Sequence, residues 1–279
     1  AGEPETITTH PFGPALCCEL SHYREAMERV WERLRRSPDV SVAIDLEGNL
    51  GGDRCHAATV QLVVDAAAKS DQQLVYVFDV HRNPAILKDT STNSLRSLFE
   101  DPSVLKVFHC CRGDVHTLYT EHNIECQCIL DTAVADSLLR AVNTNKSRGL
   151  EVVLRTWLDE QFHELEYKGS IQHEPGLWER RPLHYNLYVY AYQDVLQCNA
   201  AAAQLRMRLQ ERGLWQLCLS LSQQRVPPRS LPCWHAKHSP ATHAEIALVD
   251  GEHVICIQDS ATGQCSLPRG VLPSSQSGA

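Results

Sequence analysis

The sequence lacks the features that define several classes of protein. Its longest apolar runs, at residues 74–78 and 187–192, are far shorter than the roughly 20 residues needed to cross a bilayer, so no membrane span is predicted. No charged segment followed by an apolar one opens the chain, so a retained signal peptide is not expected. Of the 279 residues, 43% are hydrophobic and 22% charged, which excludes wholesale disorder. The length fits one large domain, or one domain plus a small module.

The sequence also lacks any Cys-x-x-Cys pair, although it contains 12 cysteines. A secreted disulfide scaffold would be much shorter, and a zinc ribbon would show paired spacing. Cys233, His235, His238 and His243 could gather a metal, but their spacing matches no standard zinc template, so a polar surface loop is the favoured interpretation. We therefore expect a reduced, intracellular protein, in the cytoplasm or the nucleus.

The sequence has fewer basic than acidic residues. The 34 acidic residues exceed the 26 basic ones, and the formal net charge is −8. A protein that binds nucleic acid by neutralising phosphates alone is usually basic. If this chain binds nucleic acid, it must use local basic patches or cations held by its acidic residues.

The first half of the chain predicts a helix followed by three strands. Residues 1–19 show no periodicity and are expected to form an arm. Apolar residues recur at helical spacing over residues 21–36, and Ser37-Pro38 ends that helix. Strand patterns then follow at residues 40–47, 59–64 and 74–80. Because only loops separate these three strands, we expect an antiparallel meander.

After Pro84 short strands alternate with helices. Strands are expected at 104–109 and 129–130, and helices at 114–121 and 132–142. This βαβα succession predicts a parallel half that joins the meander in one mixed sheet. Two further helices are expected, at 150–158 and at 184–212, and Gly213 ends the second.

The composition changes at about residue 222. Residues 223–243 contain four prolines and are predicted to be a linker. Beyond it, apolar stretches on either side of Asp250-Gly251 predict a β-hairpin. The expected organisation is an N-terminal arm (1–19), a main domain (20–222), a linker (223–243) and a small β-containing extension (244–279).

Five residues could carry chemistry, although each has a plain structural explanation. Asp45 and Glu47 lie two apart in a predicted strand, so both carboxylates project from one face, and ionising both is costly without a cation between them. On its own, the pair is more easily explained as the polar end of a strand. Asp114 begins a helix, where a carboxylate is often only a cap. Tyr190 and Asp194 lie four apart on one helix face, where a buried tyrosine is commonly a packing residue.

Taken together, these residues change the interpretation. An acid-x-acid on an early strand, a third acid about seventy residues later and a Tyr-x-x-x-Asp resemble the ordered signature of the DEDD 3′–5′ exonucleases, Tyr variant. Four segments resemble the ribonuclease D branch of that family, and Lys168 lies before the last of them: residues 98–114, 130–136, 150–154 and 178–183. The Asp-Leu-Glu-Gly and Cys-Arg-Gly-Asp forms look closest to eukaryotic relatives such as the exonuclease-like domains of Egalitarian and of piRNA-pathway proteins. One departure is Cys110, where the pattern often has a small or acidic residue.

The resemblance implies a fold and a chemistry. The implied fold is α/β, ribonuclease H-like, with a mixed sheet flanked by helices and a small β-containing C-terminal extension. The implied cofactor is a pair of divalent ions, Mg²⁺ or Mn²⁺, since hard cations prefer oxygen ligands. By resemblance, Asp45 bridges both ions, Glu47 and Asp194 complete the first, and Asp114 holds the second, partly through water. Tyr190 would orient the attacking water.

The expected substrate is RNA, at single-stranded 3′ ends, because the resemblance is to ribonuclease D. DNA is an alternative, and so is a non-catalytic RNA-binding adaptor on the same fold. Candidates to hold substrate are Lys168, Arg112, Arg180, Arg181 and His109, although solvated surface charge explains the four basic residues equally well. A homodimer, or a protein partner, could form through the N-terminal helix or the C-terminal extension. The helical HRDC module usual in this family is not evident after residue 213.

Overall fold

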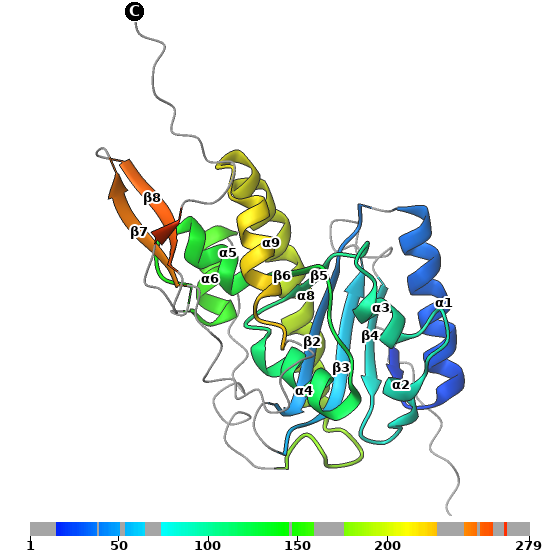
Figure 1. Ribbon diagram of the computed structural model, residues 1–279. Coiled ribbons are helices and arrows are strands. Elements are labelled where there is room, and N and C mark those ends of the chain that lie inside the picture. Colours follow the sequence, from blue (N-terminus) through cyan, green and yellow to red (C-terminus); the bar gives the residue numbers. More distant parts are fainter. Residues whose placement is uncertain are drawn as a thin grey trace, which may run out of the picture.

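The computed structural model of the chain describes residues 15–37, 39–50, 54–64, 74–144, 147–158 and 176–227, together with the backbone of three C-terminal strands. Its main body is a six-stranded sheet with helices on both faces (Figure 1). The strands are β1 (Ala15–Cys17), β2 (Val42–Asn49), β3 (His56–Val64), β4 (Leu74–Asp79), β5 (Lys106–Phe108) and β6 (Ile129–Asp131). The helices are α1 (Leu20–Arg36), α2 (Ala85–Lys88), α3 (Leu95–Glu100), α4 (Arg112–His122), α5 (Thr132–Leu139), α6 (Leu150–Trp157), α8 (Tyr185–Glu211) and α9 (Trp215–Gln223).

The order of strands across the sheet is β1-β4-β3-β2-β5-β6. β3 runs antiparallel to both β2 and β4, which confirms the predicted meander. β5 runs parallel to β2, and β6 runs parallel to β5, which confirms the predicted parallel half. The carboxyl ends of β2, β5 and β6 therefore meet at one edge of the sheet, where ligands commonly bind in open α/β sheets.

Two apolar clusters, one on each face, hold the sheet between its helices. In β2 the side chains of Val42, Ile44 and Leu46 are buried on one face, in a cluster with residues of α1, α2, α3 and α4. Ala43 is buried on the other face, in a cluster with residues of α5, α6, α8 and α9. Because side chains alternate along a strand, Asp45 and Glu47 follow Ala43 and point to the face that α8 covers.

The end of β2 is shaped by a bulge. The register with β3 shifts between Glu47 and Gly48, and Gly48 has φ +149°, a conformation that residues with a side chain rarely adopt. A Cβ atom there would lie 2.5 Å from the carbonyl oxygen of His56. Glycine is therefore required directly after Glu47, so the strand can carry that carboxylate at its very end.

Three elements, β1, α2 and α9, were not predicted. β1 lies within the predicted arm and pairs parallel with β4, because an isolated three-residue strand has too short a pattern to be recognised. α9 was not predicted either. Its nine residues are apolar on more than one side, and only the packing of Cys218 and Leu221 into the core identifies the buried face.

The C-terminal strands are β7 (His243–Val249), β8 (Glu252–Gln258) and β9 (Cys265–Ser266). β7 and β8 pair antiparallel, as the hairpin pattern predicts, and β9 pairs with β8. Most of the predicted linker lies outside the described residues, as do Cys233, His235 and His238, so the metal alternative raised for that segment stays untested. Among the helices of the described residues, none is long and apolar enough to cross a membrane.

Candidate active site

Asp45 and Glu47 line a cavity of about 300 Å³ at the sheet edge where the parallel strands end. β2 supplies both carboxylates from one face, two residues apart. α8 supplies the opposite side, with Tyr190, Asp194 and Cys198 at a spacing of four residues. Residues four apart lie on one helix face, so three turns of α8 present one side of the helix to the carboxylates of β2. Four of the five predicted catalytic residues thus share one cavity.

The surroundings of Tyr190 strongly perturb its hydroxyl. Burial raises the pKa of its hydroxyl, and the neighbouring carboxylates of Asp194, Glu47 and Asp45 raise this pKa further. The side chain of Tyr190 also shares a hydrogen bond with Asp194. Its ring packs against Trp178, with 6.1 Å between ring centroids. The phenol is therefore held protonated and in a fixed position among three acids.

Asp114 reaches the site differently. It lies in the first turn of α4, is 5% exposed, and is not among the residues that line the cavity. Its Oδ1 accepts a hydrogen bond from the backbone N–H of Leu46 at 3.2 Å, so it is attached to β2 between Asp45 and Glu47. Burial raises the pKa of its carboxyl to about 7, although the bond from Leu46 opposes that rise. The structure thus connects the fifth predicted residue to the strand that carries the first two.

A further part of the cavity wall is built from His109, Cys110 and residues 147–150. The Nε2 atom of His109 lies 3.0 Å from the carbonyl oxygen of Arg148, and its Nδ1 atom lies 2.8 Å from the hydroxyl of Thr132. Since a carbonyl can only accept, Nε2 donates to Arg148. His109 was predicted to lie near a substrate, and the structure places it in the cavity.

The turn after β5 rests on a buried aspartate. Cys110 has φ +58°, in the left-handed region, and its backbone N–H donates to Asp131, as does that of Cys111. Asp131 also accepts from the N–H of Ala133 at 2.9 Å and so caps α5. Arg225 donates to the same carboxylate at 2.6 Å. One charged pair therefore fixes the backbone next to the cavity.

The predicted substrate-binding cations do not line the cavity or fall outside the described residues. Arg181 donates from Nε and from a terminal nitrogen to the two oxygens of Asp79, at 2.5 Å each, so its guanidinium is occupied within the protein. Arg112 is the first residue of α4 and does not line the cavity. Arg180 is exposed to solvent and does not line the cavity either. Lys168 falls outside the described residues.

Sequence reasoning missed Cys198 and residues 147–150. Cys198 follows Asp194 by one helical turn, so the spacing that linked Tyr190 to Asp194 would have included it. The segment 147–150 carries no such signal. It joins the cavity only because α6 begins beside the end of β5, which is a property of the tertiary structure.

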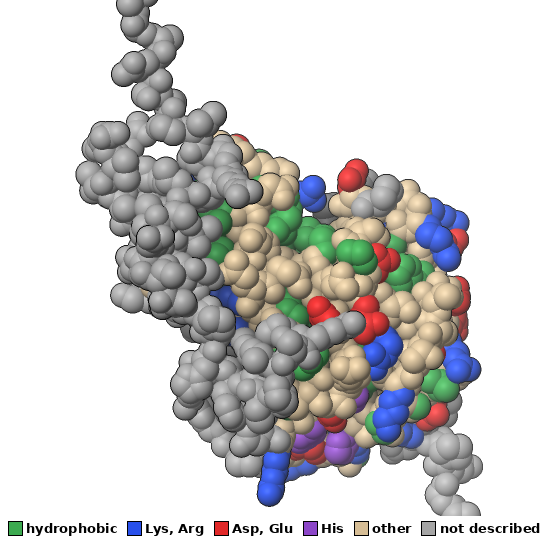
Figure 2. All heavy atoms as spheres, in the orientation of Figure 1, with side chains coloured by type: hydrophobic (Ala, Val, Ile, Leu, Met, Phe, Trp, Pro, Cys, Tyr) green, Lys and Arg blue, Asp and Glu red, His purple; other side chains and the backbone are tan. Residues whose placement is uncertain are grey.

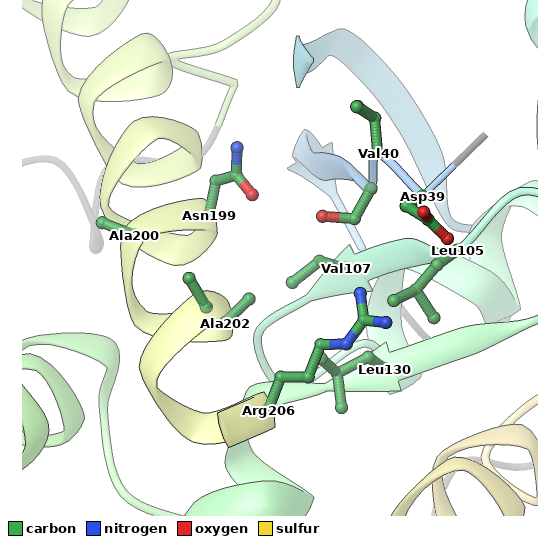
Figure 3. A pocket seen from close by; sticks show the side chains of 11 residues that line it. Asp39, Val40, Leu105, Val107, Leu130, Asn199, Ala200, Ala202 and Arg206 are labelled. Carbon is green, nitrogen blue, oxygen red and sulfur yellow. The ribbon is translucent and has the colours of Figure 1, made fainter. Parts of the chain in front are cut away.

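A second cavity of about 430 Å³ lies toward the other end of β2 and β5 (Figure 3). Asn199, Ala202 and Arg206 of α8 line it opposite Val40 and Leu105. Asp39 is the one carboxylate among its lining residues, so this cavity has no acidic pair of the kind found beside Tyr190. On the face shown in Figure 2, acidic and basic side chains are interspersed over the described part, without a continuous basic surface.

Within the part of the chain that the structure describes, no three His, Cys, Asp or Glu side chains converge closely enough to be recognised as a metal site. The donor chemistry of the cavity nevertheless suits a hard cation, since Asp45, Glu47 and Asp194 offer only carboxylate oxygens. Three acids beside one cavity, with a fourth bound to the backbone between two of them, repel one another unless positive charge is bound. The residues present therefore fit divalent ions.

Comparisons with known proteins agree with this geometry. Residues 19–210 match the family described as 3′–5′ exonuclease. No significant match occurs among curated proteins. The catalytic core of RRP6 from Trypanosoma brucei is 17% identical, with a TM-score of 0.54, over 72% of this chain and 50% of that one. This chain thus spans half the length of that relative.

Two further solved structures are similar. Trypanosoma brucei RNase D in complex with RNA is 22% identical, with a TM-score of 0.54, over 68% of this chain and 61% of that one. NrnC from Brucella melitensis with bound Mg²⁺ is 24% identical, with a TM-score of 0.51, over 66% of this chain and 81% of that one. At such identities the likeness establishes the fold, and it confirms the predicted ribonuclease H-like α/β architecture.

Proposed function

Because the chain belongs to the 3′–5′ exonuclease family, we propose that it removes nucleotides one at a time from the 3′ end of single-stranded RNA and releases nucleoside 5′-monophosphates. The observation that carries the proposal is the placement of Asp45, Glu47, Tyr190 and Asp194 around one cavity. Together with Asp114, this set matches the Tyr variant of the DEDD signature in residue type and order. The nearer resemblance to Egalitarian and to piRNA-pathway proteins stays a prediction.

We propose that the cavity binds two divalent cations, Mg²⁺ or Mn²⁺. Asp45, Glu47 and Asp194 would hold them, with Asp114 contributing from its position beside β2. When bound, such ions neutralise the phosphate, activate a water and stabilise the leaving 3′ oxygen. An Mg²⁺-bound relative of the same fold, NrnC, supports this assignment. It also explains how a chain with a net charge of −8 can bind a polyanion.

The protein's own residues position the reactants. The raised pKa of Tyr190 keeps its hydroxyl protonated at neutral pH, so this O–H donates to the carboxylate of Asp194 and the phenol oxygen can accept a hydrogen bond from water. Its bond with Asp194 fixes the direction of the hydroxyl, and its packing on Trp178 fixes the ring. We infer that Tyr190 orients the attacking water toward the phosphorus atom. This role needs orientation rather than proton transfer, which fits a phenol that does not ionise.

RNA is the proposed substrate because a relative with the same fold, RNase D, is solved with RNA bound. The wall formed by His109, Cys110 and residues 147–150 lines the same cavity as the acids and is the proposed binding site of the terminal nucleotide. DNA remains the alternative for the same carboxylates. A homodimer or a protein partner stays a prediction.

The experiment uses a 5′-labelled RNA with a single-stranded 3′ end and the matching DNA, each incubated with Mg²⁺, Mn²⁺ or EDTA. We expect a ladder of products one nucleotide apart on RNA, abolished by EDTA and by Asp45→Ala. Asp39→Asn is the matched control, because Asp39 precedes the same strand but lines the other cavity. RNA binding without any ladder would instead indicate a non-catalytic adaptor, and a ladder on DNA alone would reverse the assigned substrate.

A further inference from the structure

Asp136 is a buried carboxylate outside the set of catalytic residues. It lies in α5, and its side chain has no exposed surface. Arg140 donates to it from two nitrogens at 2.9 and 2.7 Å, and the indole Nε1 of Trp157 donates at 2.8 Å. Arg148 donates from Nε at 3.0 Å and from a terminal nitrogen. Five hydrogen bonds thus converge on one carboxylate, far more than capping or solubility requires.

These bonds keep the carboxyl of Asp136 ionised. Burial alone would raise its pKa, but hydrogen bonds from Arg148, Arg140 and Trp157 lower it below the ordinary value. A buried charge that is fully bonded by cations has a well-defined geometry, because breaking any one bond exposes a desolvated charge. The partners of Asp136 are therefore held rigidly.

One of these partners is part of the cavity wall. Arg148 lies in the segment 147–150, which lines the same cavity as Asp45, Glu47 and Asp194. Its side chain is bound to Asp136, while its carbonyl oxygen accepts from Nε2 of His109 at 3.0 Å. The segment is thus bound at two points: the guanidinium of Arg148 binds Asp136 of α5, and its carbonyl oxygen binds His109 in the turn after β5. Arg148 turns its charge inward onto Asp136.

We propose that Asp136 is a positioning residue that acts through Arg148 to hold the wall at residues 147–150 against the terminal nucleotide. The inference rests on the proposed function, since it assigns that wall to substrate binding. In this arrangement Arg148 has a structural role and does not contact a phosphate of the RNA. Loss of the contact between Arg148 and Asp136 lets this wall move and weakens RNA binding, while the acids on β2 and α8 keep their positions.

The structure offers a matched control. Arg140 binds the same carboxylate as Arg148 with similar geometry, but it lies at the end of α5 and does not line the cavity. Arg140→Met and Arg148→Met each remove one cation from Asp136, and only the second detaches the wall. Both arginine side chains are partly exposed, at 24% and 26%, so both variants are expected to fold.

The experiment measures turnover of the RNA with Mg²⁺ and, separately, equilibrium binding of the same RNA by fluorescence anisotropy with Ca²⁺ in place of Mg²⁺. We expect Arg148→Met to raise KM and the RNA Kd about tenfold while kcat changes less than about threefold. Arg140→Met should stay within about twofold of the wild type in both. Asp136→Asn should resemble Arg148→Met, and the double variant should be no worse than the single ones.

The salt dependence of RNA binding distinguishes a structural role of Arg148 from a direct contact between Arg148 and a phosphate. An arginine that neutralises one phosphate of a single strand contributes about 0.7 to the slope of log K against log salt concentration. We expect Arg148→Met to leave this slope unchanged. A reduced slope would show that Arg148 contacts RNA and would overturn the inference, as would wild-type binding by a folded Arg148→Met. If Asp136→Asn fails to fold, the comparison of Arg140→Met with Arg148→Met and the salt dependence of RNA binding still test the proposal.

Failure of the proposed function gives a different result. A wild-type protein that binds RNA but does not cleave it contradicts the exonuclease assignment, while the binding data on the arginine variants still test the wall. A wild-type protein that binds no RNA overturns both.

Discussion

The backbone N–H of Leu46 donates to Oδ1 of Asp114 at 3.2 Å, although the two residues are 68 positions apart in the chain. Leu46 stands between Asp45 and Glu47, so the bond attaches the third acid to the strand that carries the first two. The side chain of Leu46 is buried on the opposite face of the sheet. Hydrophobic packing on one face therefore helps to align carboxylates on the other.

This arrangement predicts a pH-dependent stability in the metal-free protein. The pKa of Asp114 is about 7 in the folded state and 3.8 ordinarily, so the folded state binds the proton more tightly than the unfolded state. The resulting stabilisation is complete below about pH 4 and is lost as the pH rises through 7. In EDTA, Asp114→Asn should therefore raise Tm at about pH 8 and have little effect at about pH 4. Calorimetry at both pH values would contradict this if the variant changed Tm equally at each.

Removing Asp194 should abolish turnover without unfolding the protein. Its carboxylate lines the cavity and is bonded to Tyr190, and its neighbours Asp45 and Glu47 repel it. We expect Asp194→Asn to lower kcat by roughly a thousandfold or more, with unchanged or higher Tm. Single-turnover cleavage of RNA measures the first quantity and a thermal melt the second. Normal turnover by a pure sample of this variant would remove Asp194 from the site.

Replacing Tyr190 with phenylalanine should have a milder effect. The ring keeps its packing on Trp178, while the hydrogen bond to Asp194 is lost. We expect kcat to fall about tenfold to hundredfold and KM to change little. Tyr192→Phe serves as the control, because Tyr192 lies on the same helix but packs on Tyr188, at 5.3 Å between centroids, and does not line the cavity. Equal losses in both variants would argue against a role specific to Tyr190.

Breaking the pair of Arg225 with Asp131 should destabilise the fold. The two side chains are 7% and 0% exposed, and Arg225 donates to Asp131 at 2.6 Å. Arg225→Met leaves an unpaired buried carboxylate and should reduce the free energy of unfolding by about 3–5 kcal/mol. The exposed pair of Arg29 with Glu25 offers a comparison, since Arg29→Met should cost less than about 1 kcal/mol. Urea titrations of both variants would show whether the two costs differ as stated.

The strands and helices that carry the site were predictable because their patterns are local. Apolar residues at helical spacing predicted α1 and α8, and alternation predicted β2, so the shared faces of Asp45 with Glu47 and of Tyr190 with Asp194 followed directly. Asp114 was predicted as a site residue only through the family resemblance, since a carboxylate at a helix start is usually a cap. The structure adds its bond to Leu46, which no spacing could indicate.

Other parts were not predictable because they depend on contacts between distant segments. Arg181 was a candidate for binding phosphate, yet its guanidinium is paired with Asp79, 102 positions away. Asp136 ends one of the segments that resemble the ribonuclease D branch, but neither it nor Arg148 was predicted to be a site residue. The packing of whole helices and strands determines which cation pairs with which carboxylate. A local sequence pattern does not show which charged residues are neighbours in the fold.

Local periodicity in the sequence by itself determined the mixed α/β order and the strand and helix faces on which four of the catalytic candidates lie, because alternation and helical spacing act over a few residues. The tertiary structure alone decided how those faces meet. It brought α8 onto β2, attached Asp114 to the backbone of that strand and placed residues 147–150 in the same cavity as the acids. Such placements arise from burying two apolar clusters on the two faces of one sheet, and that burial is a property of the whole chain.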